Sequence, residues 1–173
     1  MTSELGPART VFEGRLFRVE QVEIEGSDHP WDLVRHPGSA GVLALTPDDE
    51  AILVEQWRPA IGGTLREIPA GVFDVEGEDA LSCATRELLE ETGHGHETIE
   101  FLGGCYPSPG FVDEYIHLFM GTTGPEPMRN PEPGIELVRV PFEDLARAAR
   151  AGRIRDAKTA LAVMLVEARR SSR

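Results

Sequence analysis

The sequence predicts an α+β fold in which a mixed β-sheet packs between helices. Three observations support this expectation: strand-like segments dominate the first third of the chain, one clearly capped helix lies in the middle, and two helices follow the last strand. With 173 residues and 19.0 kDa, the chain has the length of one domain and can bury a core without disulfides.

The N-terminal third predicts two pairs of strands. Residues 12–24 alternate loosely between apolar and polar side chains and predict a strand pair that turns at Gly14-Arg15. A short strand is expected at residues 31–36, ended by Pro37-Gly38. The apolar segments 41–46 and 51–57 predict a hairpin, because the residues between them are turn formers.

The clearest helix covers residues 80–92, where Asp79 can cap the start and Gly93 can end the helix in a left-handed conformation. Strands are expected at residues 111–120 and 135–140, with proline-rich loops on either side of the first. Residues 142–151 and 157–170 predict the last two helices, separated by Gly152.

Charge and composition restrict the partners. The chain has 17 Lys and Arg against 30 Asp and Glu, a net charge of −13, which argues against binding to nucleic acid. No apolar segment is long enough for a membrane span, and no signal-peptide pattern precedes Thr10. Cys83 and Cys105 make no disulfide framework, so a cytoplasmic protein is expected.

The chemistry concentrates on the helix at residues 80–92. At 100° per residue, Glu87 and Glu91 project side by side along the edge of the apolar stripe, and Glu90 points further outward. Like charges near a helix C-terminus are unfavourable, and a divalent cation such as Mg²⁺ would reverse that effect. A solvated acidic face is the competing interpretation of these glutamates.

The surrounding residues favour the metal. Glu78, seven intervening residues, and then Arg86-Glu87-Leu88-Leu89-Glu90-Glu91-Thr92-Gly93 resemble the signature of the Nudix hydrolases, Gly-x5-Glu-x7-Arg-Glu-U-x-Glu-Glu-x-Gly-U. Two departures are present. Six residues instead of five separate Gly71 from Glu78, and His94 occupies the final apolar position. We expect His94 and His96 to lie on the surface.

The resemblance implies a Nudix-type α/β/α sandwich with a mixed β-sheet, preceded by a small N-terminal antiparallel sheet. It also implies a site for Mg²⁺ or Mn²⁺. The expected ligands are the Ala70 carbonyl and the carboxylates of Glu87, Glu90 and Glu91, with Arg86 orienting these glutamates. The implied reaction is attack of a metal-activated water on the pyrophosphate of a nucleoside diphosphate derivative.

Three further segments look like the ADP-ribose pyrophosphatase group, whose products are AMP and ribose 5-phosphate. Pro109 lies fifteen residues after His94, and the residues from Ser108 to Glu114 resemble that group's loop. Gln56-Trp57-Arg58-Pro59 and Glu67-Ile68-Pro69-Ala70-Gly71 also match. The substrate contacts expected on this basis are Arg58, Glu67, Pro109, Gly110, Phe111 and Glu114, with Arg58 on the diphosphate.

The resemblance also predicts a general base in the loop before the last strand. Glu132 and Glu136 are the carboxylates available there, and the sequence does not choose between them. Proline and glycine around Glu132 favour a mobile loop that closes on substrate, whereas Glu136 lies in or beside a strand.

The N-terminal segment resembles the sheet through which the ADP-ribose group forms dimers. We therefore expect a homodimer, with residues 1–38 as a dimerisation segment and residues 39–173 as the hydrolase domain. Two alternatives stay open. One is a Nudix hydrolase acting on another nucleotide sugar, coenzyme A or an oxidised nucleotide, and the other is a non-catalytic ADP-ribose sensor.

Overall fold

The computed structural model describes residues 5–172, which form two compact units. The first unit contains the residues up to Gly38 together with Tyr106–Tyr115. The second contains Ser39–Cys105 and the residues from Ile116 onward.

The first unit is a three-stranded antiparallel sheet in the order β1-β2-β3, formed by β1 (Leu5–Glu13), β2 (Arg18–Ile24) and β3 (Trp31–Arg35). The segment 106–115 joins it through backbone bonds, because Val34 donates to the Phe111 carbonyl and Asp113 donates to the Val34 carbonyl. Every residue of β1 is exposed, including Val11 and Phe12. This unit therefore presents an uncovered apolar edge strand.

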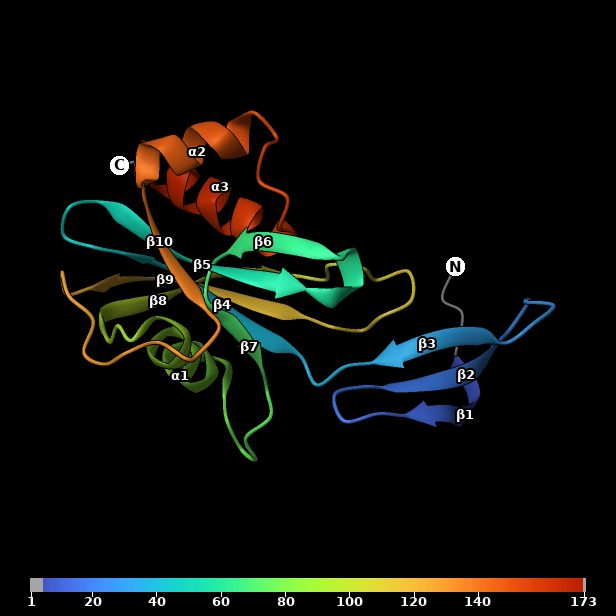
Figure 1. The fold of residues 1–173 in the computed structure, drawn as a ribbon. Coiled ribbons are helices and arrows are strands. Elements are labelled where there is room, and N and C mark those ends of the chain that lie inside the picture. The colour runs from blue at the N-terminus through green and yellow to red at the C-terminus, as the bar shows by residue number, and fades with distance from the viewer. Residues whose placement is uncertain (1–4, 173) are drawn as a thin grey trace. The chain divides into compact units, whose positions relative to one another are not determined.

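The second unit is built on a mixed seven-stranded sheet (Figure 1). Five strands follow the order β10-β5-β4-β9-β8, with β6 beside β5 and β7 beside β4. β4 and β9 are parallel, and the other pairs are antiparallel. The strands are β4 (Ser39–Leu45), β5 (Glu50–Arg58), β6 (Gly63–Glu67), β7 (Ala70–Val72), β8 (His96–Cys105), β9 (Ile116–Thr123) and β10 (Glu136–Pro141). A short 3-10 helix, Pro59–Ile61, joins β5 to β6.

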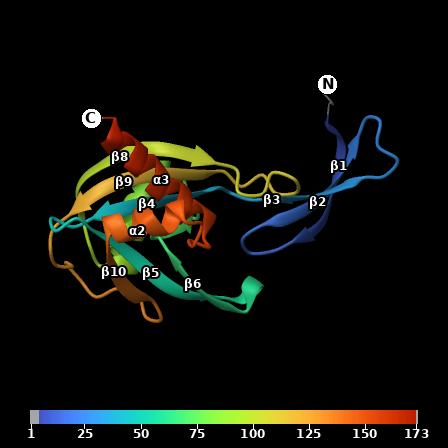
Figure 2. The ribbon, with the colours of Figure 1, turned by 90° about the horizontal axis from the view of Figure 1, so that it is seen from above.

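Helices cover both faces of this sheet, as the two views in Figures 1 and 2 agree. α1 (Ala80–Thr92) lies on one face, and α2 (Phe142–Arg150) and α3 (Ala157–Ser171) lie on the other. The period-2 alternation of β4 explains the two cores. Leu43 and Leu45 pack with the α2 and α3 side chains, whereas Val42 and Ala44 pack with Leu88 of α1. The predicted α/β/α sandwich with a mixed sheet is confirmed.

The elements agree with the sequence predictions, with three exceptions. The first strand of the pair predicted over residues 12–24 begins earlier than expected, because β1 covers Leu5–Glu13 and only its last two residues lie in the predicted range. The strands β6, β7 and β8 were not predicted. The strand expected over residues 111–120 is wrong in its first half, because the chain turns at Ser108, whose carbonyl accepts from the Phe111 and Val112 N–H groups. β9 therefore begins at Ile116. Among the described residues, no helix combines the length and apolar character that crossing a membrane requires.

Candidate active site

α1 is positioned by its two ends. The Asp79 carboxylate accepts a hydrogen bond from the Ser82 N–H at 2.7 Å, and Gly93 ends the helix with a φ of 74°. Leu88 and Ala84 are fully buried against the sheet. This anchoring places the charged residues along one edge of the helix beside β7, which contains Gly71.

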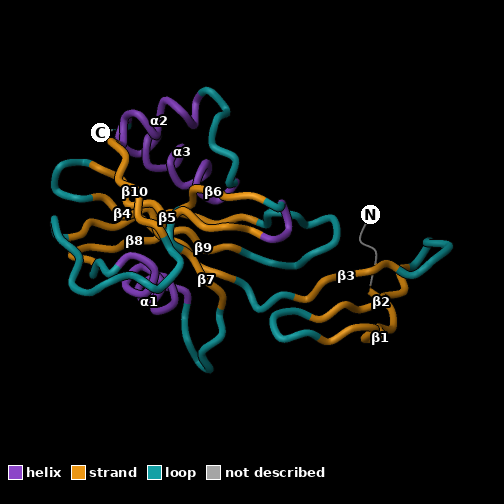
Figure 3. Tube along the Cα trace, viewed as in Figure 1, coloured by secondary structure: helices purple, strands orange, loops and turns teal. Residues whose placement is uncertain are grey.

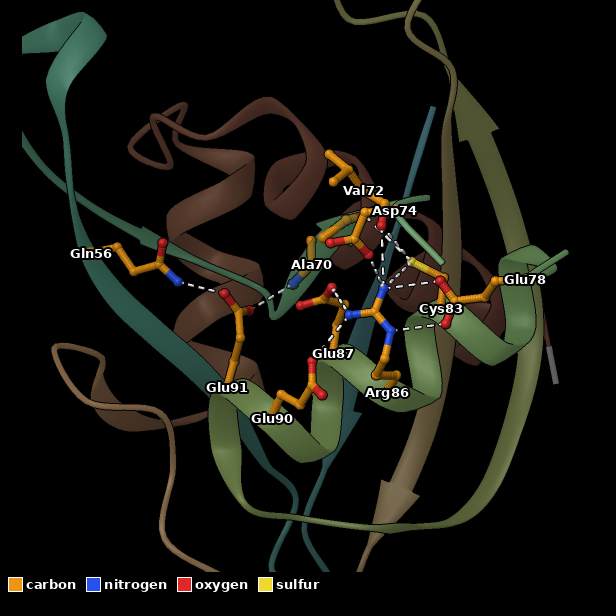
Figure 4. Close-up of polar contacts among 11 residues, drawn as sticks. Gln56, Ala70, Val72, Asp74, Glu78, Cys83, Arg86, Glu87, Glu90 and Glu91 are labelled. Atoms are coloured by element: carbon orange, nitrogen blue, oxygen red, sulfur yellow. Dashed lines mark hydrogen bonds and ion pairs between the residues drawn. The ribbon is translucent and has the colours of Figure 1, made fainter. Parts of the chain in front are cut away.

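The Arg86 guanidinium is the centre of the charged cluster (Figure 4). It donates two bonds of 2.9 Å to Glu78, one of 2.6 Å to Glu87 and one of 3.0 Å to Glu90. It also reaches Asp74 and the Val72 carbonyl. Despite the longer loop after Gly71, Glu78 therefore lies against Arg86, which lowers the pKa of the Glu78 carboxyl.

Glu87 occupies a space that exists because residue 71 is glycine. A Cβ at Gly71 would lie 1.9 Å from Oε1 of Glu87, so any side chain there would displace the carboxylate. Burial raises the pKa of Glu87 to about 7, and the charges of Glu90 and Glu91 add to this effect, against the attraction of Arg86. The Glu87 carboxylate thus lies where ionisation is unfavourable.

Glu91 is the most buried carboxylate of α1, with 7% of its surface exposed. It accepts hydrogen bonds from the Gln56 side chain at 2.6 Å and from the Ala70 N–H at 2.9 Å. Burial raises its pKa above the ordinary value in spite of these donors. Glu91 therefore ties α1 to β5 and to the start of β7, where the Ala70 carbonyl is located.

The donor set fits a hard divalent cation. Carboxylate oxygens from Glu87, Glu90 and Glu91 and the nearby backbone of Ala70 are the ligand type that Mg²⁺ and Mn²⁺ prefer. Within residues 5–172, no three acidic, histidine or cysteine side chains already converge as a ready-made ion site. Instead, Arg86 holds Glu87 and Glu90, and Gln56 holds Glu91.

A second charged network connects β5, β6 and α3. Arg58 donates two bonds to the Glu67 carboxylate, at 2.7 and 3.0 Å, and Lys158 contacts the same carboxylate. Glu67 is only 2% exposed. Burial opposes its ionisation, but the hydrogen bond from Arg58 and the charge of Lys158 outweigh burial and hold its pKa below the ordinary value. Lys158 was not identified by sequence analysis.

The loop between β9 and β10 attaches to the C-terminal end of α1 (Figure 3). The Met128 and Arg129 N–H groups donate to the Gly93 carbonyl, and the Glu132 N–H donates to the Glu90 carbonyl at 2.9 Å. Glu136 instead begins β10, where it pairs with Glu55 of β5. The backbone of Glu132 is thus bonded directly to the acidic helix, whereas that of Glu136 belongs to the sheet.

The same loop explains why the surface location predicted for His94 is wrong. The chain turns inward after Gly93, and the loop that follows β9 covers it, so His94 is 1% exposed. In the described part of the chain its two ring nitrogens have no hydrogen-bond partner, and burial lowers its pKa. His96 is exposed, as predicted.

The remaining predicted contacts lie in the first unit. Pro109, Gly110 and Phe111 belong to the turn beside β3, and Glu114 lies 3.9 Å from the His36 ring. Their roles toward a ligand stay predictions.

Comparison with known proteins identifies the family. A profile of the NUDIX domain matches residues 35–161. The chain belongs to the NUDIX family. Two relatives are 34% identical over 164 residues, covering 91% of this chain and 88% of each relative: a methanol dehydrogenase activator from Bacillus methanolicus and an ADP-ribose pyrophosphatase from Bacillus subtilis (strain 168). A GDP-mannose pyrophosphatase from Yersinia pestis (strain Pestoides F) is 32% identical over 144 residues, 77% of this chain and 70% of the relative.

The NUDIX match includes both charged networks. α1 with Glu78 and Arg86, the pair Arg58–Glu67, and Lys158 all lie inside the matched range. The family match thus spans both the acidic residues of α1 and the basic residues that contact Glu67.

Proposed function

We propose that this NUDIX protein hydrolyses the pyrophosphate bond of ADP-ribose or a related nucleoside diphosphate sugar, giving AMP or the corresponding nucleotide and a sugar phosphate. The observation that carries the proposal is the placement of the buried Glu87 and Glu91 carboxylates against β7: Glu87 fills the space beside Gly71, and Glu91 accepts from the Ala70 N–H at 2.9 Å. The names of the ADP-ribose and GDP-mannose pyrophosphatase relatives support the substrate class.

The metal is proposed to be Mg²⁺ or Mn²⁺, held by Glu87, Glu90, Glu91 and the Ala70 carbonyl. When bound, such an ion supplies Lewis-acid chemistry and lowers the pKa of water. Arg86 holds the carboxylates of Glu87 and Glu90 in place by hydrogen bonds. The exposed part of the Arg58 guanidinium offers N–H donors to the diphosphate. Pro109, Gly110, Phe111 and Glu114 are proposed to contact the nucleoside or sugar.

We propose Glu132 rather than Glu136 as the general base. The backbone bond from Glu132 to Glu90 supports this choice, because it keeps Glu132 beside the acidic helix. Replacing Glu132 with Gln should reduce kcat by about a hundredfold or more, and Glu136→Gln serves as the matched control. Loss of rate only in the Glu136 variant would contradict the assignment.

The decisive experiment is a substrate panel. ADP-ribose, GDP-mannose, coenzyme A and an oxidised nucleoside triphosphate are assayed for released product with Mg²⁺ and with Mn²⁺. We expect turnover of a nucleoside diphosphate sugar, reversible loss of activity in EDTA, and no turnover by Glu91→Gln. Tight binding of ADP-ribose without hydrolysis would favour the sensor instead, and activity that survives EDTA would contradict the metal role.

We further propose that the protein is a cytoplasmic homodimer that does not act on nucleic acid, with residues 1–38 as the dimerisation segment and residues 39–173 as the hydrolase domain. The exposed apolar residues of the first unit support the interface; they include Leu5, Val11, Phe12, Leu16, Phe17 and Trp31. Sedimentation equilibrium tests the proposal: Phe12→Asp should yield a monomer, whereas a monomeric wild-type chain would contradict it.

A further inference from the structure

The ion pair between Arg58 and Glu67 presents a problem for the proposed diphosphate contact. The Glu67 carboxylate receives both Nε and Nη2 of Arg58, so this edge of the guanidinium faces the protein interior. A buried carboxylate with a single cationic partner binds that partner strongly. Arg58 can bind a phosphate group only if a second cation also neutralises the Glu67 carboxylate.

Lys158 of α3 is a second cation on the Glu67 carboxylate. Its Nζ contacts Oε2 of Glu67 and donates to Oδ1 of Asp156 at 3.0 Å. The Lys158 side chain is only 12% exposed, so this contact is shielded from solvent. Lys158 and Glu67 are 91 positions apart in the sequence and meet because the start of α3 lies beside the end of β6 (Figure 1).

The start of α3 is itself fixed. Asp156 caps the helix by accepting from the Thr159 N–H at 3.0 Å, and the Thr159 hydroxyl accepts from the Ile68 N–H at 2.8 Å. Ile68 directly follows Glu67. The cap, the hydroxyl and the ammonium thus attach one end of α3 to the strand end that carries Glu67.

The charges of this network balance. Arg58 and Lys158 supply two positive charges, and Glu67 and Asp156 supply two negative charges. Without Lys158 the network would carry one net negative charge, close to the three glutamates of α1. A diphosphate would then meet additional repulsion, and Arg58 would be drawn further toward Glu67.

We infer that Lys158 is a positioning residue for diphosphate binding: by neutralising Glu67, it leaves the outer edge of the Arg58 guanidinium available to the phosphate oxygens. The inference rests on the proposed function and adds to it a residue from α3. Lys158 acts through Glu67 and Arg58 and does not itself touch the substrate.

The test replaces Lys158 with Met, which retains the apolar stem and removes the charge. Lys158→Arg is the conservative rescue. Arg155→Met is the charge-matched control, because Arg155 is exposed one residue before Asp156 and takes part in none of these contacts. Binding of ADP-ribose is measured by calorimetry in EDTA, where no turnover occurs, and kcat and KM are measured with Mg²⁺.

We expect Lys158→Met to raise both Kd and KM for ADP-ribose by about tenfold or more, with a much smaller change in kcat. Lys158→Arg should restore most of the affinity, and Arg155→Met should bind like the wild type. Unchanged Kd and KM in Lys158→Met would overturn the inference, as would equal weakening by Arg155→Met, which would indicate a general charge effect.

A double variant keeps the test decisive if Lys158→Met does not fold. In a Glu67→Gln background the negative charge of Glu67 is absent, so adding Lys158→Met should raise Kd much less than it does in the wild type. A further tenfold loss in that background would contradict action through Glu67. A wild-type chain that neither binds nor hydrolyses any diphosphate sugar would refute the proposed function and this inference together, whereas an active wild type with an unaffected Lys158→Met refutes only the inference.

Discussion

The space at Gly71 allows a quantitative prediction for Gly71→Ala. The added Cβ would lie 1.9 Å from Oε1 and 2.1 Å from Cδ of Glu87. Ordinary van der Waals contact begins near 3.4 Å, so the carboxylate has to retreat by about 1.5 Å. Catalytic groups tolerate displacements of only about 0.5 Å, and a misplacement of about 1 Å can reduce rates by about a hundredfold.

We therefore expect Gly71→Ala to reduce kcat for ADP-ribose by about a hundredfold or more and to weaken Mn²⁺ binding measured by electron paramagnetic resonance. Stability should change by less than about 1 kcal/mol, because a flexible side chain moves and the backbone does not. Gly63→Ala is the control, since a Cβ at Gly63 would meet nothing closer than 3.9 Å.

A shorter acid tests whether the clash is the cause. Glu87→Asp withdraws the carboxylate by one methylene group, so Gly71→Ala should reduce the rate far less in that background than in the wild type. Full activity of Gly71→Ala, or strictly additive losses in the double variant, would refute this account of the site.

Three further predictions concern stability. Gly93→Ala should destabilise the protein by about 2 kcal/mol in urea unfolding, because φ is 74° and the new Cβ would lie 1.9 Å from the Arg129 carbonyl oxygen. An unchanged urea midpoint would be inconsistent with the close approach of the β9–β10 loop to Gly93. Asp79→Ala should reduce the free energy of unfolding by about 1 kcal/mol by removing the cap on Ser82, and an equal loss in the exposed variant Asp48→Ala would count against a capping effect. The pKa of Glu87 is about 7 in the folded protein and 4.5 when unfolded. In EDTA the free energy of unfolding should therefore fall by up to about 3 kcal/mol as the pH rises from 5 to 8. An equally steep fall with pH in Glu87→Gln would contradict this.

Features set by neighbouring residues were predictable from the sequence. α1 begins after Asp79 and ends before Gly93, because both boundaries depend on local capping. The helical wheel also gave the right order of exposure, with Glu91 and Glu87 more buried than Glu90. Spacing on one helix thus sufficed to group these carboxylates.

Features set by distant residues were not predictable. The sequence did not predict β8, because Gly103 and Gly104 interrupt its alternation of apolar and polar residues and a register shift occurs between Phe101 and Gly103. The burial of His94 depends on a loop that follows β9, and the contact of Lys158 with Glu67 depends on the packing of α3. Nothing in the local sequence marks either residue, since each receives its role from a partner elsewhere in the chain.

The β9–β10 loop, which carries the candidate base Glu132, is attached to α1 by several backbone hydrogen bonds. The N–H groups of Met128 and Arg129 donate to the Gly93 carbonyl and that of Glu132 donates to the Glu90 carbonyl, all at the C-terminal end of α1. Release of the loop would expose these amides together, so they should exchange with deuterium at a common rate. Slower exchange of these amides in the presence of a non-hydrolysable diphosphate analogue would show that the loop carrying Glu132 stays bonded to α1 when a diphosphate is bound.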